Sequence, residues 1–237
     1  MKKGTPRIAV GFDFDHTLGI DNKLERVAFL HLLESFPRQD LTLAEETERI
    51  DALLAQQRSG AFTIDDAVER FARAHGVTEE FDRYIERFKR FALEGVDDFV
   101  IPLPGLKEML SELNDANIPT AILSNGWSPL QDRKAQCVGF AGPVLVSDRI
   151  GSQKPDRKAF AALREALGAT PDATWYVGDN AAVDVAGALN AELHAVWLDE
   201  GGIYPQELRR PTATLVDLRE LPAMLLARKA TRSRAQP

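Results

Sequence analysis

The chain has 237 residues, of which 44% are hydrophobic and 27% are charged, and this balance excludes a collagen, a coiled coil and a wholly disordered protein. The net charge of −7 argues against a general nucleic-acid-binding or anionic-membrane-binding protein. Cys137 is the only cysteine. No apolar run approaches the ~20 residues of a membrane span. The basic N-terminal residues are not followed by an apolar stretch as long as that of a signal peptide. We therefore expect a cytoplasmic protein without disulfides.

The first predicted element is a strand over residues 8–12, where a continuous apolar run stops at Asp13. Continuous apolar runs of this length are typical of strands that are covered on both faces. Residues 19–98 contain no similar run, and their apolar residues recur at helical spacing instead. The four helical patterns begin near Leu24, Ile50, Ile64 and Phe81.

Two of the helix starts in this stretch carry a capping pattern. The segments Thr42-x-x-Glu45 and Thr63-x-x-Asp66 place a hydroxyl group three residues before a carboxyl group. This spacing predicts reciprocal hydrogen bonds between each side chain and the backbone of the other residue.

The helical stretch is best explained as an insertion between the first and second predicted strands of the sheet. We expect residues 19–98 to form a helical cap domain, and residues 1–18 and 99–237 to form the core that carries it. The ends of the insertion, near Gly19 and Pro102-Leu103-Pro104, are the expected hinges.

Beyond residue 99, strand-like runs alternate with helical patterns. Further apolar runs that end abruptly cover residues 120–123, 144–146, 175–177 and 195–198. Apolar residues recur at i, i+3, i+4 and i+7 from Leu106 to Leu113, and a similar pattern starts at Phe160. This alternation predicts an α/β fold with a doubly wound, Rossmann-like parallel sheet.

Polar residues follow the predicted strands, at the edge where open parallel sheets bind ligands. They are Asp13, Asp15, Ser124, Asn125, Lys154, Asp179 and Asp184. Each alone has an ordinary explanation, as a turn residue, an exposed lysine or a helix cap. Together, clustered carboxylates repel one another unless a cation lies among them, and hard oxygen ligands beside a lysine and a hydroxyl suit Mg²⁺ and a phosphate. The set therefore predicts phosphoryl transfer.

The order of these residues resembles the motifs of the haloacid dehalogenase-like (HAD) superfamily. Asp13 to Leu18 read D-F-D-H-T-L, Ser124 follows an apolar strand, Lys154 precedes Pro155, and Gly178 to Asp184 read G-D-N-A-A-V-D. These segments are similar to the four family motifs in order and spacing. The helical insertion lies where one subgroup of the family carries its cap domain.

The resemblance implies a role for each motif residue. Asp13 is the nucleophile and becomes an aspartyl-phosphate, and Asp15 is the general acid and then the general base. Thr17 helps to orient the loop. Ser124 and the backbone N–H of Asn125 hold a phosphoryl oxygen.

The remaining roles concern charge. The resemblance implies that Lys154 offsets negative charge on the transferring group and on Asp13. It also implies that Mg²⁺ is held by the carboxylates of Asp13 and Asp179 and by the backbone carbonyl of Asp15. Asp184 is either a further ligand or a partner of one.

Two positions depart from the family pattern. His16 occupies a position where the family often has glycine. We interpret it as a residue that simply accommodates the backbone conformation at this position, rather than as a catalytic group. The acid that often follows the Thr-Leu pair is shifted by one position, to Asp21.

The resemblance implies an enzyme, a Mg²⁺-dependent phosphatase that acts on a small phosphorylated metabolite. A phosphomutase of the same superfamily, a 2-haloacid dehalogenase-like hydrolase and a non-enzymatic protein that binds a phosphorylated ligand are the alternatives. Asp15 argues against the dehalogenase, because cleavage of a carbon–halogen bond needs no proton donor. The basic residues of the insertion that could meet an anionic substrate are Lys23, Arg26, Arg38 and Arg58.

Overall fold

The computed structural model describes residues 8–21, 23–37, 40–58 and 60–234. Its centre is a six-stranded sheet in the order β5-β4-β1-β6-β7-β8, and each neighbouring pair is parallel. The strands are β1 (Ala9–Phe12), β4 (Thr120–Ser124), β5 (Val144–Val146), β6 (Thr174–Gly178), β7 (His194–Leu198) and β8 (Ala213–Leu215). The expected α/β fold is confirmed, and β8 is an edge strand that we did not predict.

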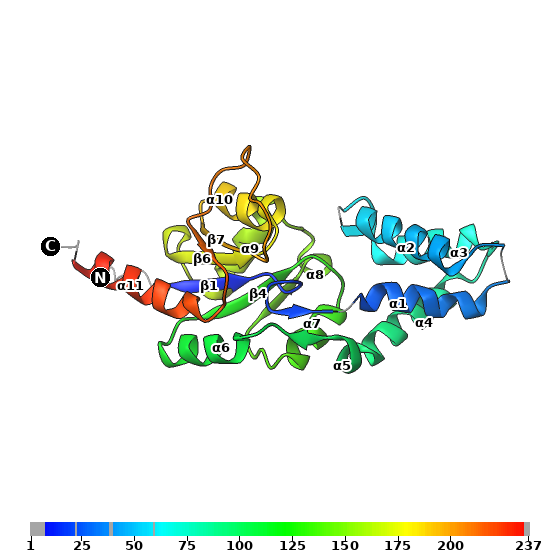
Figure 1. The fold of residues 1–237 in the computed structure, drawn as a ribbon, viewed down its shortest axis with the longest axis horizontal. Helices are drawn as coiled ribbons and strands as arrows, with labels where there is room; N and C mark the ends of the chain where they lie inside the picture. The colour runs from blue at the N-terminus through cyan, green and yellow to red at the C-terminus, as the bar shows by residue number, and fades with distance from the viewer. Residues whose placement is uncertain (1–7, 22, 38–39, 59, 235–237) are drawn as a thin grey trace.

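Helices cover both faces of this sheet (Figure 1). They are α6 (Leu106–Asp115), α7 (Leu130–Cys137), α8 (Ser147–Ile150), α9 (Arg157–Leu167), α10 (Ala186–Asn190) and α11 (Glu220–Arg234). Along β1, Ala9 packs into the core under α9 and α10, and Val10 packs into the core under α6 and α11. This alternation explains why the strand is apolar at every position.

The remaining helices form what we call the helical segment, residues 24–99, at one end of the long axis (Figure 1). They are α1 (Leu24–Leu32), α2 (Leu43–Arg58), α3 (Ile64–Ala74), α4 (Phe81–Glu94) and α5 (Val96–Phe99). Phe29 lies at the centre of this packing, with ring centroids 5.1 Å from Phe71 and 4.6 Å from Phe88.

The capping patterns form the expected bonds. Thr63 and Asp66 make a complete capping box at the start of α3. Before α2, the backbone N–H of Thr42 donates to the Glu45 carboxylate at 2.7 Å, and the N–H of Glu45 donates to the Thr42 hydroxyl at 3.3 Å. These bonds satisfy N–H groups that the first turn of a helix leaves unpaired.

The chain enters and leaves the helical segment through a short antiparallel ribbon. Strand β2 (Gly19–Ile20) pairs with β3 (Ile101–Pro102), so that the two connections run side by side. This ribbon lies next to the carboxyl end of β1, and it therefore joins the helical segment to the edge of the sheet where polar residues gather.

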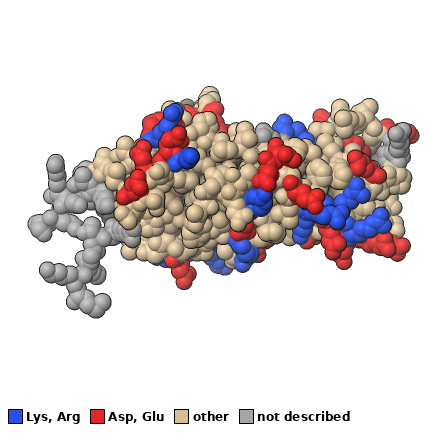
Figure 2. All heavy atoms as spheres, turned by 90° about the horizontal axis from the view of Figure 1, so that it is seen from below, with Lys and Arg blue, Asp and Glu red and all other residues tan. Residues whose placement is uncertain are grey.

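The surface carries mixed charge. Figure 2 shows acidic and basic side chains interspersed over the helical segment on the face in view. None of the helices in the described part of the chain combines the length and the apolar composition that a bilayer crossing requires.

Candidate active site

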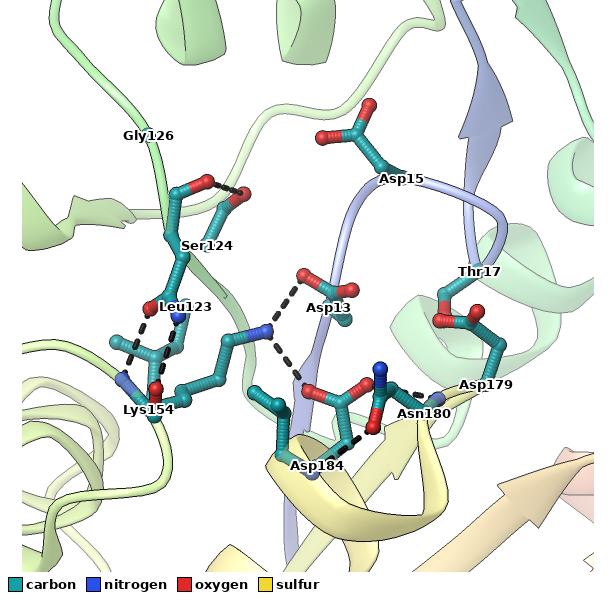
Figure 3. Close-up of polar contacts among 12 residues, drawn as sticks. Asp13, Asp15, Thr17, Leu123, Ser124, Gly126, Lys154, Asp179, Asn180 and Asp184 are labelled. Carbon is teal, nitrogen blue, oxygen red and sulfur yellow. Dashed lines mark hydrogen bonds and ion pairs between the residues drawn. The ribbon is translucent and has the colours of Figure 1, made fainter. Parts of the chain in front are cut away.

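The site lies at the carboxyl ends of three neighbouring strands (Figure 3). Strand β1 lies between β4 and β6, so the residues that follow these strands meet at one edge. Asp13 follows β1, Ser124 ends β4, and Asp179 follows β6. The strands that come next in the chain, β4 and β5, lie on one side of β1, and the later strands β6, β7 and β8 lie on its other side. Open α/β sheets bind ligands at such a switch point.

A buried lysine joins two of the carboxylates. The Lys154 Nζ atom donates to Asp13 Oδ1 at 2.7 Å and to Asp184 Oδ1 at 2.8 Å. The lysine side chain is only 2% exposed. The alternative explanation of Lys154, as an ordinary exposed lysine, is therefore wrong. The two carboxylates raise the pKa of Lys154 well above its usual value, against the effect of burial, and the ammonium group therefore stays charged.

The carboxylates resist ionisation in this setting. Burial raises the pKa of Asp13 to about 7, an effect that Lys154 opposes and that Asp184 and Asp15 reinforce. Burial and the charge of Asp13 raise the pKa of Asp179 to about 6. The pKa of Asp184 is also raised by burial. Burial thus makes the ionised form less favourable for all three carboxyl groups, although Lys154 opposes this effect at Asp13 and Asp184.

These carboxylates form a set that suits a cation. Carboxylate oxygens of Asp13, Asp179 and Asp184 lie within 4.8 Å of one another. Hard oxygen ligands of this kind fit Mg²⁺, and a divalent cation would offset both the burial and the mutual repulsion that raise their pKa values. Asp184 is engaged at both oxygens, because Oδ1 accepts from Lys154 and Oδ2 accepts from the backbone N–H of Asn180 at 3.0 Å.

The loop after β6 is shaped by Gly178 and Asn180. A Cβ atom at Gly178 would lie 2.4–2.5 Å from the side chain of Asp184, so glycine allows this carboxylate to approach. The Asn180 Oδ1 atom accepts from the N–H groups of Ala182 and Val183 and caps the turn that carries Asp184. We did not predict a role for Asn180, although an asparagine at a helix start is a common capping signal.

The other predicted residues surround this centre. The Asn125 side chain exchanges two hydrogen bonds with the backbone of Lys154, at 2.8 and 2.9 Å, and so holds the lysine loop against the end of β4. Ser124 is buried. The Thr17 hydroxyl is buried and donates to Asp179 Oδ1 at 3.4 Å.

Asp15 lies further along the same loop, and its carboxyl group points away from the Asp13 side chain (Figure 3). Its oxygens accept from Lys134 Nζ at 3.0 Å and from Gln131 Nε2 at 3.3 Å. Both donors come from α7. We missed them in the sequence, because neither belongs to an apolar pattern or follows a predicted strand.

His16 and Asp21, the two departures from the family pattern, have distinct surroundings. His16 has a φ of 61°, a left-handed conformation that glycine adopts more readily. Its exposed ring lies 3.3 Å from Glu200. Asp21 is paired with Lys134 at 2.9 Å.

The site opens into a cavity of about 610 Å³ between the sheet edge and the helical segment. Asp13, Asp15, Lys154 and Asp179 line it from the core. Arg26 and Arg58 line it from the helical segment, and Lys23, which directly precedes α1, lines it beside them. Arg38 lies outside the described residues.

Two of these basic residues have acidic partners. Arg26 is paired with Asp51, and Arg58 lies 3.6 Å from Glu25. Arg58 also lines an adjoining cavity of about 510 Å³, so it stands where the two spaces meet.

Known proteins resemble this chain in sequence and in fold. It is 35% identical to the phosphoserine phosphatase of Thermus thermophilus over 50% of this chain and 49% of that one. It is 30% identical to the pyrimidine 5'-nucleotidase YjjG of Escherichia coli over 56% of this chain and 60% of that one. The matched part thus spans about half to three-fifths of these relatives.

Among solved structures, the magnesium-bound HAD-hydrolase YfnB of Bacillus subtilis superposes with a TM-score of 0.69 at 23% identity, covering 93% of this chain and 99% of that one. This likeness concerns the fold. The family model of the haloacid dehalogenase-like hydrolases matches residues 9–192, a range that contains Asp13, Ser124, Lys154, Asp179 and Asp184. The chain therefore belongs to the haloacid dehalogenase-like hydrolases.

Proposed function

We propose that the protein is a Mg²⁺-dependent phosphatase that hydrolyses a small phosphomonoester through an aspartyl-phosphate on Asp13. The observation that carries this proposal is the pair of carboxylates with separate surroundings. Asp13 lies in the buried cluster with Lys154, and Asp15 lies at the cavity, outside that cluster. This difference in surroundings supports a division of roles in which Asp13 attacks and Asp15 transfers protons.

In the first step, a carboxylate oxygen of Asp13 attacks phosphorus and the bond from phosphorus to the leaving oxygen breaks. Asp15 gives its proton to that oxygen, and the alcohol departs. Lys154 offsets the negative charge that Asp13 shares with the phosphoryl group, and Ser124 Oγ and the Asn125 backbone N–H hold phosphoryl oxygens.

In the second step, Asp15 removes a proton from water and the water oxygen attacks phosphorus. The bond from phosphorus to Asp13 then breaks, which releases phosphate and restores both carboxyl groups. Asp15 therefore ends each cycle protonated, as it began.

The metal proposal assigns Asp13, Asp179 and the Asp15 backbone carbonyl as the groups that would hold Mg²⁺. When bound, the ion supplies positive charge to the phosphoryl oxygens. We assign Asp184 to Lys154 rather than to direct ligation, because both of its oxygens already accept hydrogen bonds. In this role Asp184 keeps the ammonium group pointed at Asp13.

We also propose that residues 19–98 act as a cap domain over a core of residues 1–18 and 99–237. The cavity between them supports this division, because both parts contribute to its lining. The substrate's leaving group would lie among Lys23, Arg26 and Arg58, where Asp51 and Glu25 already pair with the two arginines.

The test is phosphate release from a panel of phosphorylated metabolites and from p-nitrophenyl phosphate, with Mg²⁺ and with a chelator. We expect turnover that needs Mg²⁺, none with Asp13→Asn, and normal turnover with Asp82→Asn, an exposed acid on α4. Transfer of phosphate to a second sugar phosphate would indicate a phosphomutase. Halide release from 2-chloropropionate without phosphatase activity would overturn the proposal.

A further inference from the structure

A buried lysine lies behind Asp15, outside the lining of the cavity. The side chain of Lys134 is 1% exposed. Its Nζ atom lies 3.0 Å from Asp15 Oδ1 and 2.9 Å from Asp21 Oδ2. One ammonium group thus joins the carboxylate of the site loop to the carboxylate that directly follows strand β2.

An ammonium group at this place needs a physical reason. Removing a charge from water is costly, and an apolar residue of similar volume would fill the same space on α7 without that cost. The two carboxylates offset the cost and raise the pKa of Lys134 above its usual value, against the effect of burial. Lys134 thus lies between the two carboxylates, and its Nζ atom is within 3.0 Å of an oxygen of each.

Asp15 is held at both oxygens by the same helix. Gln131 Nε2 donates to Oδ2 at 3.3 Å, and Lys134 donates to Oδ1. The two donors are three residues apart, which places them on one face of α7. The Asp15 side chain is 35% exposed, so the packing around it would allow it to rotate. Hydrogen bonds to both of its oxygens from one helix hold it in a single orientation.

We propose that Lys134 is the positioning residue of Asp15, which it holds in one orientation at the cavity wall without touching the substrate. This inference rests on the proposed acid–base role of Asp15. It adds to that role a residue of α7 that belongs to none of the four sequence motifs.

The proposal predicts a particular kinetic signature. Lys134→Met keeps the length of the side chain and removes its charge. We expect kcat to fall by about 10–100-fold, because misplacing a catalytic group by about 1 Å costs up to about 10² in rate. KM should change by less than about twofold, since Lys134 does not contact the substrate.

The deciding experiment is a double-mutant cycle of Lys134→Met and Asp15→Asn, assayed with p-nitrophenyl phosphate and Mg²⁺. If Lys134 acts through Asp15, the double variant is no slower than Asp15→Asn alone. Multiplied losses in the double variant, or an unchanged kcat in Lys134→Met, would overturn the proposal. A parental rate in Asp15→Asn would instead overturn the acid–base role itself, so the two failures are distinguishable.

Two further variants keep the test independent of folding. Arg133→Met removes the neighbouring cation of α7, which pairs with Asp97 on the outside, and should leave kcat unchanged. If the loss of Lys134 prevents folding because Asp21 is left buried and unpaired, the same cycle is run with Asp21→Asn as the parent. In this parent too, the proposal is supported if adding Lys134→Met to Asp15→Asn causes no further loss of kcat. It is refuted if the two losses of kcat multiply, or if Lys134→Met leaves kcat unchanged.

Discussion

At the scale of single residues, the site buries carboxyl groups in surroundings that raise their pKa values. Burial makes the ionised forms of Asp13 and Asp179 less favourable, and the charge of Asp13 adds to this effect at Asp179. A site built to receive a cation has this property in its metal-free state, because the groups that bind the ion repel one another without it.

The raised pKa of Asp179 gives a prediction for the metal-free protein. Its pKa is about 6 in the folded chain and about 3.9 in an unfolded one, so its contribution to stability is present below about pH 4 and is lost as the pH rises through 6. Asp179→Asn removes this loss. In a chelator at pH 8, we expect its free energy of unfolding to exceed that of the parent by roughly 1–3 kcal/mol, as measured by urea denaturation.

The same variant tests the assignment of Asp179 as a metal-binding residue. At pH 4 its advantage in the chelator should disappear. At pH 8, Mg²⁺ should raise the melting temperature of the parent, since the ion binds only the folded state, and should have little effect on Asp179→Asn. An equal response to Mg²⁺ in both proteins would contradict the assignment.

At the scale of elements, the helical segment depends on a small aromatic core. Phe29 is fully buried between Phe71 and Phe88. We expect Phe29→Ala to lower the free energy of unfolding by about 3–5 kcal/mol, because it leaves a cavity that three helices enclose. Leu43→Ala is the control, since Leu43 is 68% exposed. Equal effects of the two substitutions on urea denaturation would refute this account of the core.

The sequence predicted the elements whose patterns are local. The strands of the sheet interior are continuous apolar runs because both faces are covered, and the segment Thr63-x-x-Asp66 marks a helix start through bonds within one turn. The site residues were predictable for the same reason, because Asp13 and Asp179 directly follow such strands and Ser124 ends one.

Other features depend on contacts between distant segments and carry no local signal. Strand β8 has three residues with uneven burial, too few to show a period. Lys134 meets Asp15 across 119 positions of the chain, and only the packing of α7 beside the site loop brings them together. The ribbon of β2 and β3 is equally non-local, since each strand has two residues.

At the scale of the whole molecule, the helical segment and the sheet are joined by the two antiparallel connections β2 and β3 and meet again beside the cavity. At this second meeting point Gly60, which follows α2, approaches Gln153 so closely that a Cβ atom would lie 1.8 Å from Gln153 Nε2. The helical segment thus reaches the loop that precedes Lys154, and a ligand in the cavity would contact both parts.

This arrangement predicts that a ligand changes the exposure of the connections. With Mg²⁺ and vanadate as a phosphate analogue, we expect slower cleavage by a protease near residues 19–21 and 102–104, because closure over a ligand orders such segments. Mass spectrometry of the fragments locates the cuts. Identical cleavage with and without vanadate would contradict a cap that closes.

The central claim is that Asp13 forms the phosphoenzyme and that Asp15 moves the protons. Rapid mixing of Asp15→Asn with p-nitrophenyl phosphate tests it most directly, because nitrophenolate leaves with little help from an acid, whereas the attack of water still needs a base. The account predicts a burst of about one equivalent of nitrophenolate per enzyme, followed by turnover about 10²–10⁴-fold slower than in the parent. An alkyl phosphate should give no such burst. Turnover of both substrates at the parental rate would contradict the account.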